Sequence, residues 1–166
     1  MVQALSRRRP DLWVSVSATT RAPRSGEVPG ESYLFIAPAE FAETVRSGGF
    51  LEHADYSGAS YGTPREPVAR RLARGETVLL EIDLAGARQV RTAQPRALFV
   101  FLAPPSWREL EDRLTGRGTE QAADRGKRLA VARQEMAAAH EFDAVVVNDE
   151  VERAAEELLA LIRSHR

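Results

Sequence analysis

The loop 17–24 carries two arginines and several hydroxyl groups, the side chains that bind phosphate in proteins. It reads SATTRAPR, it follows an apolar run, and Pro23 and Gly26 keep it out of regular secondary structure. Arg21 and Arg24 can grip one phosphate from two sides, because each guanidinium offers a planar fork of N–H donors. A surface loop with two solvated arginines explains this segment equally well when it is taken alone.

Carboxylates and phenols downstream could face the same cavity, although each of them singly is more typical of a structural residue. They are Glu27, Tyr33, Glu52 and Tyr61. Glu81 and Asp83 end the apolar run 78–83, and their two-residue spacing places both on one face of a strand. Open α/β sheets bind ligands beyond the carboxyl ends of their strands, where a nucleotide or its magnesium ion would lie. The alternative is a pair of exposed acids at a strand end.

A second basic group flanks glycines further along the chain. A glycine hinge between basic residues predicts a lid that closes over anions, and an exposed, charged helix pair is the competing interpretation. Gly126-Lys127 does not make a phosphate loop, because Gln121 stands in place of the first glycine and Arg128 in place of Ser or Thr. The basic group comprises Arg113, Arg117, Arg125, Lys127 and Arg128, with Gly116 and Gly118 between them.

Short apolar runs without strict alternation are typical of strands covered on both faces, and they occupy 13–18, 77–83, 97–102 and 144–147. Helical spacing predicts helices over 38–47, 66–74, 84–93, 124–139 and from 151 onward. Ser106 and Glu109 form a capping box that opens one more helix. This alternation predicts an α/β domain with a mainly parallel sheet. Residues 33–61 alternate apolar and polar side chains, which predicts a small, partly antiparallel subdomain.

Composition bounds the class of protein. At about 150 residues per domain, 166 residues make one domain, and 43% hydrophobic with 28% charged residues exclude disordered, collagen-like and coiled-coil chains. A net charge of −1 creates no field that would attract nucleic acid or an anionic membrane, so we expect neither partner. The absence of cysteine excludes disulfides and thiol nucleophiles, and no apolar run could span a membrane. We predict a cytoplasmic protein, and nothing in the sequence predicts an oligomeric state.

The first residues read as the last turns of a helix. Apolar residues among the first five are followed by arginines at 7–9 and by Pro10, which are helix stop signals, and no N-cap residue precedes them. Either a short N-terminal helix docks on the sheet, or the polypeptide starts inside an element whose first half is missing.

Seven segments, in this order and spacing, resemble bacterial guanylate kinase over essentially the whole chain. They are SVSATTRAPRSGE, SYLF, GGFLEHADYSGASYGTP, LLEIDLAGARQV, FLAPPS, LTGRGTE and VVVND. The resemblance implies a phosphate-loop nucleoside-monophosphate-kinase fold, which is an α/β fold with helices on both faces of a parallel sheet. It further implies a core of residues 1–20, 76–112 and 140–166, a small mixed GMP-binding subdomain of 21–75, and a lid of 113–139.

The same resemblance implies the reaction, which is transfer of the γ-phosphoryl group of ATP to GMP with Mg²⁺ as cofactor. The residues implied to hold the GMP phosphate are Arg21, Arg24, Tyr33 and Tyr61, with Glu27 as partner of the arginines. Those implied to read guanine are Ser17, Glu52, Thr63 and Asp83. Those implied to contact ATP are Arg113, Arg117, Arg128 and Asn148, while Glu81 would reach Mg²⁺ through water. The implied catalytic residues are Arg21, Arg117 and Arg128.

Guanine recognition by a carboxylate is chemically reasonable. A carboxylate accepts hydrogen bonds from guanine N1–H and the exocyclic amine, whereas adenine has no such donor pair. Buried acceptors left unpaired cost about 1 to 3 kcal/mol each, so AMP should be rejected. Phosphoryl transfer itself needs in-line positioning and charge stabilisation, which arginines and a metal supply.

The sequence departs from this family at its start. The family begins with a strand, a glycine-rich phosphate loop ending in Gly-Lys-Ser or Thr, and a helix, of which only the tail matches residues 2–9. Without that loop ATP should bind poorly. The family's first strand lies between those predicted at 77–83 and 97–102, so its loss would expose two apolar strand edges. We therefore interpret the sequence as an incomplete copy of an enzyme, most simply with a start codon placed too late.

Two other interpretations stay open. One is a non-catalytic guanylate-kinase-like module that binds GMP or a phosphorylated partner through Arg21 and Arg24. The other is a misfolded remnant without activity.

Overall fold

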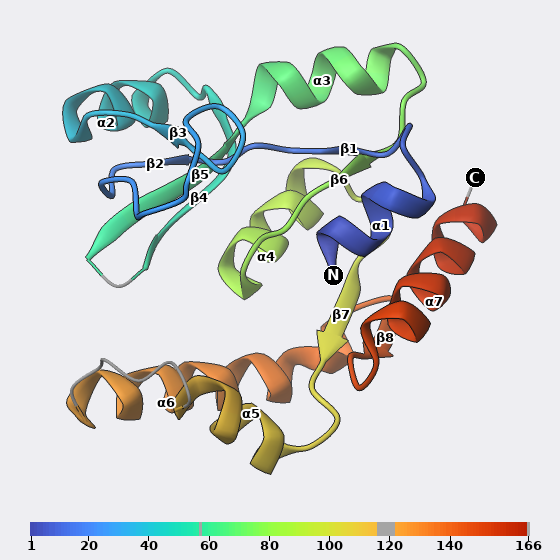
Figure 1. The fold of residues 1–166 in the computed structure, drawn as a ribbon. Coiled ribbons are helices and arrows are strands. Elements are labelled where there is room, and N and C mark those ends of the chain that lie inside the picture. Colours follow the sequence, from blue (N-terminus) through green and yellow to red (C-terminus); the bar gives the residue numbers. More distant parts are fainter. Residues whose placement is uncertain (57, 116–121, 166) are drawn as a thin grey trace. The chain divides into compact units, whose positions relative to one another are not determined.

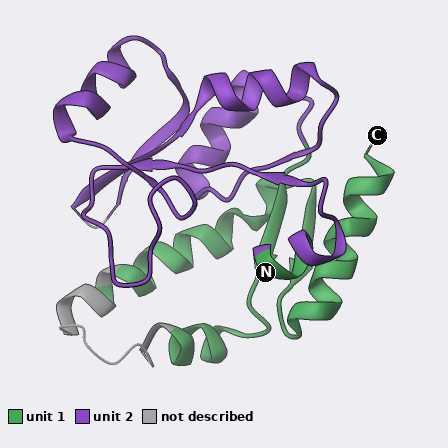
Figure 2. Ribbon diagram, turned by 45° about the horizontal axis from the view of Figure 1, so that its top comes forward, with its two compact units in different colours: residues 1, 3–5, 98–166 green, residues 2, 6–97 purple. Residues whose placement is uncertain are grey.

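The computed structural model describes residues 1–56, 58–115 and 122–165. The chain forms two compact units, an N-terminal unit of residues 2 and 6–97 and a C-terminal unit of residues 1, 3–5 and 98–166 (Figure 2). Helices and strands are interspersed along the chain, in agreement with the predicted α/β class (Figure 1). Helix α1 (Val2–Arg8) ends on two arginines just before Pro10, as the stop signals predict.

The N-terminal unit contains two sheets. Strands β1 (Trp13–Val14) and β6 (Val78–Leu79) form a parallel pair. The second sheet has the order β3-β2-β5-β4 and comprises β3 (Leu34–Phe35), β2 (Ala18–Thr19), β5 (Ala59–Pro64) and β4 (Phe50–Tyr56). Strands β2 and β3 are parallel, and β5 runs antiparallel to both of its neighbours. The partly antiparallel pairing predicted over 33–61 is therefore confirmed, with β2 as an additional strand.

Three of the predicted strands are shorter in the structure, and the one predicted over 97–102 begins only at Val100. The run 13–18 divides between the two sheets: its first two residues pair with β6, whereas Ala18 pairs with β3 and β5. The chain changes sheets at residues 15–17, because the Ser15 N–H donates to Leu79 while the Ser17 carbonyl accepts from Leu34, both at 2.9 Å. The run 77–83 stops pairing as a strand at Leu79.

Three helices complete the N-terminal unit: α2 (Pro38–Arg46), α3 (Arg65–Ala73) and α4 (Leu84–Ala93). Helix α2 begins with a proline in its first turn, where the missing N–H costs nothing. Its Phe41 packs on Phe50 of β4 with ring centroids 4.5 Å apart, and Ala18 completes this buried cluster. Helix α4 is capped by Asp83, whose Oδ1 accepts a hydrogen bond from the Gly86 N–H at 2.7 Å.

The C-terminal unit contains a parallel pair of strands, β7 (Val100–Ala103) and β8 (Ala144–Val147). Its helices are α5 (Trp107–Thr115), α6 (Ala122–Ala137), the short 3₁₀ helix η1 (Ala138–Glu141) and α7 (Val151–Ser164). The predicted cap of α5 is present, since the Glu109 N–H donates to Ser106 Oγ at 3.2 Å. In the part of the chain that the structure describes, no helix is long and apolar enough to cross a membrane.

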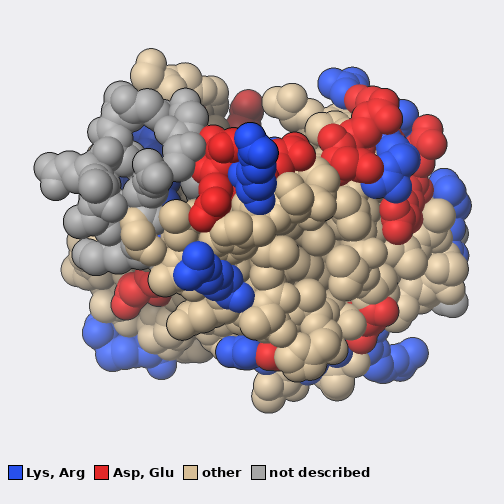
Figure 3. Space-filling model, turned by 90° about the horizontal axis from the view of Figure 1, so that it is seen from below, with Lys and Arg blue, Asp and Glu red and all other residues tan. Residues whose placement is uncertain are grey.

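Charged side chains of opposite sign adjoin one another on the face drawn in Figure 3, in keeping with the net charge of −1. The division into core, GMP-binding subdomain and lid stays a prediction. Within the predicted lid, residues 116–121 lie outside the described chain.

Candidate functional site

Arg21 lies two residues after β2, and its guanidinium donates hydrogen bonds to several acceptors around it. Its Nη1 and Nη2 donate to the two carboxylate oxygens of Glu27 at 2.9 and 2.8 Å. Nη1 also donates to the Ala22 carbonyl at 2.8 Å, and Nε donates to the Tyr61 hydroxyl at 3.3 Å. These bonds use all but one of the five N–H donors of a guanidinium, and the remaining one is on Nη2. The arginine is thus oriented before any ligand arrives.

Aromatic rings form the other side of this arginine site. The Arg21 Cζ lies 5.4 Å from the Tyr33 ring centroid and 5.9 Å from that of Phe35, within cation–π range. Tyr33 also meets Tyr61 edge-on, with centroids 5.9 Å apart. Sheet pairing explains this convergence, since Thr19 of β2 lies opposite Phe35 on one side and Tyr61 on the other. Phe35 was not among the predicted site residues.

Glu27 organises the loop that follows. Besides its fork to Arg21, its Oε2 accepts a hydrogen bond from the Arg24 backbone N–H at 2.7 Å. Gly26 adopts a φ of +84° between them, a conformation that favours glycine. The hydrogen bond from Arg21, supported by the one from Arg24, lowers the pKa of Glu27 to about 2. The hydrogen bond with Glu27 in turn raises the pKa of Arg21. The Arg24 side chain, in contrast, is exposed.

We expect this ion pair to make the stability of the fold acid-sensitive. Because the pKa of Glu27 is about 2 in the folded chain and about 4.3 in an unfolded one, its contribution is complete above pH 5 and is lost as the pH falls toward 2. Urea unfolding between pH 6 and pH 2.5 should show a steeper loss of stability for the wild type than for Glu27→Gln. Parallel pH profiles would remove Glu27 from this role.

A second polar cluster is buried between β4 and β5. Glu52 and Thr63 are opposite each other in the hairpin, are 5% and 0% exposed, and the Thr63 hydroxyl donates to Glu52 Oε1 at 2.5 Å. Burial is the main cause that raises the pKa of Glu52, and the nearby charge of Asp83 adds to it. Glu52 is therefore a buried carboxylate with one oxygen bonded to Thr63 and the other, Oε2, close to Gly86 of α4.

The two clusters share one strand. Tyr61 and Thr63 are two residues apart on β5, so their side chains project from the same face of the sheet. Two residues of strand span about 7 Å. A single ligand of nucleotide size can therefore contact the arginine cluster with one end and the Glu52 cluster with the other.

Three further predicted residues lie near β2 and α4. Ser17 is half-buried and lies just before β2. Asp83 caps α4, as described above, so its carboxylate has a structural role in addition to any contact with a base. Glu81 is exposed in the segment between β6 and α4, and it makes no hydrogen bond or ion pair among the described residues. One exposed carboxylate suits Mg²⁺, which keeps most of its water and takes few protein ligands.

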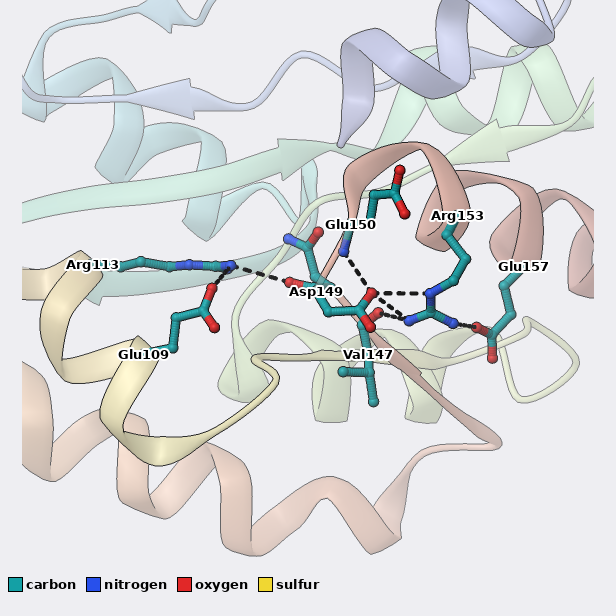
Figure 4. A network of polar contacts seen from close by, with 8 residues as sticks. Glu109, Arg113, Val147, Asp149, Glu150, Arg153 and Glu157 are labelled. Carbon is teal, nitrogen blue, oxygen red and sulfur yellow. Dashed lines mark hydrogen bonds and ion pairs between the residues drawn. The ribbon is translucent and has the colours of Figure 1, made fainter.

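The residues predicted to contact ATP belong to the C-terminal unit, and Figure 4 shows part of them. Arg113 on α5 forms an ion pair with Glu109 and donates to the Asn148 carbonyl at 3.2 Å. The Asn148 N–H donates to Ala103 of β7 at 2.7 Å, so both backbone groups of Asn148 are fixed. Arg128 lies on α6 and is half-buried, whereas Arg117 lies outside the described residues.

Arg153 holds the turn that follows β8, a contact that the sequence did not indicate. Its guanidinium donates to Asp149 Oδ1 from Nε and Nη2 at 3.0 and 2.5 Å, and to the Val147 carbonyl at 2.9 Å (Figure 4). This pairing lowers the pKa of Asp149 and raises that of Arg153. Asp149 lies before Glu150, the N-cap of α7, so the helical spacing of charged pairs did not predict this contact.

Comparisons with known proteins agree with one another. The sequence model of the family described as guanylate kinase matches residues 1–165. The guanylate kinase of Thermobifida fusca (strain YX) is 57% identical over 162 residues, which are 98% of this chain and 83% of that protein. The one from Streptomyces coelicolor (strain ATCC BAA-471 / A3(2) / M145) is 53% identical over 97% of this chain and 82% of its own. The crystal structure of guanylate kinase from Anaplasma phagocytophilum superposes with a TM-score of 0.82 at 30% identity, covering 98% of this chain and 80% of that one.

Proposed function

The chain belongs to the guanylate kinase family, and we propose that it transfers the terminal phosphoryl group of ATP to GMP, giving ADP and GDP. The observation that carries this proposal is the shared face of β5. Tyr61 belongs to the arginine cluster and Thr63 to the Glu52 cluster, at a separation that a mononucleotide spans. We name the two clusters the phosphate end and the base end of the site.

At the phosphate end, Arg21 and Tyr61 are prepared as donors. The free N–H of Arg21 Nη2 can bond to a phosphate oxygen. The Tyr61 oxygen accepts from Arg21, so its own proton is directed elsewhere and is available to the same phosphate. Glu27 balances the charge of Arg21, while the exposed Arg24 and the Tyr33 hydroxyl supply the remaining attraction for a dianion.

At the base end, the donor pattern of guanine matches the acceptors present. Glu52 in its ionised form accepts from N1–H and from the exocyclic amine, and Asp83 and Ser17 lie within the same unit to complete the contacts. Because the Thr63 proton is committed to Glu52, the Thr63 oxygen is left as an acceptor. Adenine would present an acceptor at N1 to this carboxylate, so AMP should bind much more weakly.

The transfer step requires the phosphate of GMP to attack the γ-phosphorus of ATP in line, with ADP leaving. We assign Arg21, Arg117 and Arg128 to stabilise the charge on the transferring group, and Arg113 and Asn148 to the ATP side. Glu81 would hold Mg²⁺ through water, and the ion would neutralise charge on the ATP phosphates. A cytoplasmic location stays a prediction.

Calorimetric titration with GMP and then with ATP, followed by a coupled assay for ADP, tests the proposal. We expect GMP to bind at one site per chain, and GDP to form wherever ATP binds together with Mg²⁺. Binding of GMP without ATP would indicate either the non-catalytic module or an incomplete copy of the enzyme. Absence of GMP binding by a chain that unfolds cooperatively would overturn the proposal.

A further inference from the structure

Strand β4 lies at one edge of the four-stranded sheet, because the strand order is β3-β2-β5-β4. An edge strand pairs on one side only, and the N–H and C=O groups of alternate residues point away from the sheet. His53 is such a residue, one position after the Glu52 of the base end. Whatever holds the backbone of His53 also holds the residue that reads the base.

Gln89 of α4 occupies this edge. Its Oε1 accepts a hydrogen bond from the His53 N–H at 3.1 Å, and its Nε2 donates to the His53 carbonyl at 2.8 Å. The side-chain amide therefore offers one donor and one acceptor to a single residue, as a neighbouring strand does. Both edge groups of His53 are satisfied by one side chain that is 36 residues away in sequence.

Gly86 lies one helical turn before Gln89, on the same face of α4. A Cβ at this position would stand 2.6 Å from Glu52 Oε2 and 3.3 Å from Asp83 Oδ1. A Cβ atom in a real protein essentially never comes within 3.0 Å of such an oxygen, so the carboxylate of Glu52 occupies space that exists only because residue 86 has no side chain. Helix α4 thus contacts two successive residues of β4. Gly86 lies against Glu52, and Gln89 is bonded to His53.

We propose that this face of α4 is a positioning element for guanine recognition, with Gln89 as its positioning residue; the inference rests on the proposed function. Gln89 holds the backbone of β4, Gly86 leaves room for the carboxylate, and Thr63 holds its other oxygen. None of these three contacts involves the phosphate end. The element therefore sets the preference for guanine, whereas affinity for the phosphate is set elsewhere.

The first test compares Gln89→Leu with the wild type for binding of GMP and of IMP, which shares the phosphate and ribose but lacks the exocyclic amine. Loss of both hydrogen bonds should weaken GMP binding about tenfold and IMP binding much less, so that the GMP to IMP ratio falls. Gln89→Glu keeps the acceptor for the His53 N–H but has no donor for the His53 carbonyl. Its GMP to IMP ratio should lie between those of Gln89→Leu and the wild type. Gln94→Leu, a matched change at the exposed C-cap position of the same helix, should bind both as the wild type does.

If Gln89 acted on stability alone, Gln89→Leu would lower the affinities for GMP and IMP together and leave their ratio unchanged. That result would overturn the inference. A wild-type chain that binds neither nucleotide would contradict the proposed function instead.

Hydrogen exchange of the His53 amide gives a measurement without any ligand. Its protection should drop at least about tenfold in Gln89→Leu, and unchanged protection would overturn the inference whatever binds.

Gly86→Ala provides a second variant whose fold should survive, because alanine is the better helix former and Gly86 has no positive φ. The added methyl should displace the Glu52 carboxylate and lower the GMP to IMP ratio by about tenfold or more. A ratio equal to that of the wild type would show that the carboxylate does not depend on this face of α4.

Discussion

Glu52→Gln is expected to lower GMP affinity by about 100-fold, which corresponds to about 2.7 kcal/mol. The carboxylate is 5% exposed, and it is the acidic acceptor that the structure places against Thr63. An amide at this position keeps one acceptor but presents N–H donors to the N1–H or the amine of guanine, so at least one contact turns repulsive. Affinity for AMP should change little, since adenine gains nothing from the carboxylate. Calorimetry with both nucleotides measures the two effects.

The pH dependence of GMP binding supplies a second signature of the same residue. Burial raises the pKa of Glu52, and guanine binds the ionised form, so affinity should rise with pH beyond the ordinary range of a carboxyl group. In Glu52→Gln this increase of GMP affinity with pH should be lost. Only the pH dependence that comes from ionisation of the GMP phosphate should remain. Glu66→Gln, a matched change at an exposed position on α3, should behave as the wild type. A Glu52 variant with unchanged selectivity and an unchanged pH profile would contradict the assignment.

Arg21→Ala is the second change with a large expected effect, a loss of GMP affinity of about two to three orders of magnitude. Two causes act together. The phosphate loses a donor that the surrounding bonds had oriented, and Glu27 is left without its partner beside a dianion. Calorimetry with GMP measures the loss, and turnover should fall as well wherever phosphoryl transfer is observed.

Companion variants separate these causes. Arg21→Ala combined with Glu27→Gln should recover part of the lost affinity, because the repulsive carboxylate is gone. Arg21→Lys keeps the charge but not the planar fork, and should lie between alanine and the wild type. Arg46→Ala on α2 removes an exposed arginine paired with Glu43 and should have no effect. Equal GMP affinity for Arg21→Ala and the wild type would remove this residue from the site.

Local signals predicted several elements closely. The helical pattern over 84–93 coincides with α4, and of the capping box predicted at Ser106 the bond from the Glu109 N–H to the Ser106 hydroxyl is present at the start of α5, while the Glu109 carboxylate pairs with Arg113. These features depend on neighbours three or four residues apart, which a sequence displays directly. The run 13–18 was read as one strand because apolar runs do not reveal which partner each residue pairs with.

Contacts between side chains that are distant in sequence could not be predicted from such local patterns. The arginines, tyrosines and carboxylates of the site were assigned by family resemblance, and the structure brings Arg21, Glu27, Tyr33 and Tyr61 together in one unit. The contact of Gln89 with His53 had no local signal, because it depends on how α4 docks on the edge of β4. Gly86 was visible as a glycine inside a predicted helix, yet only the position of Glu52 explains why it is there.

A crystal structure of the chain with GMP bound tests the central claim most directly. The account predicts phosphate oxygens within hydrogen-bond distance of Arg21 and Tyr61, and the N1 edge of guanine against the Glu52 carboxylate on the same face of β5. A nucleotide seated with its phosphate at the Arg21 cluster but its base turned away from Glu52 and Thr63, or bound elsewhere in the chain, would contradict it.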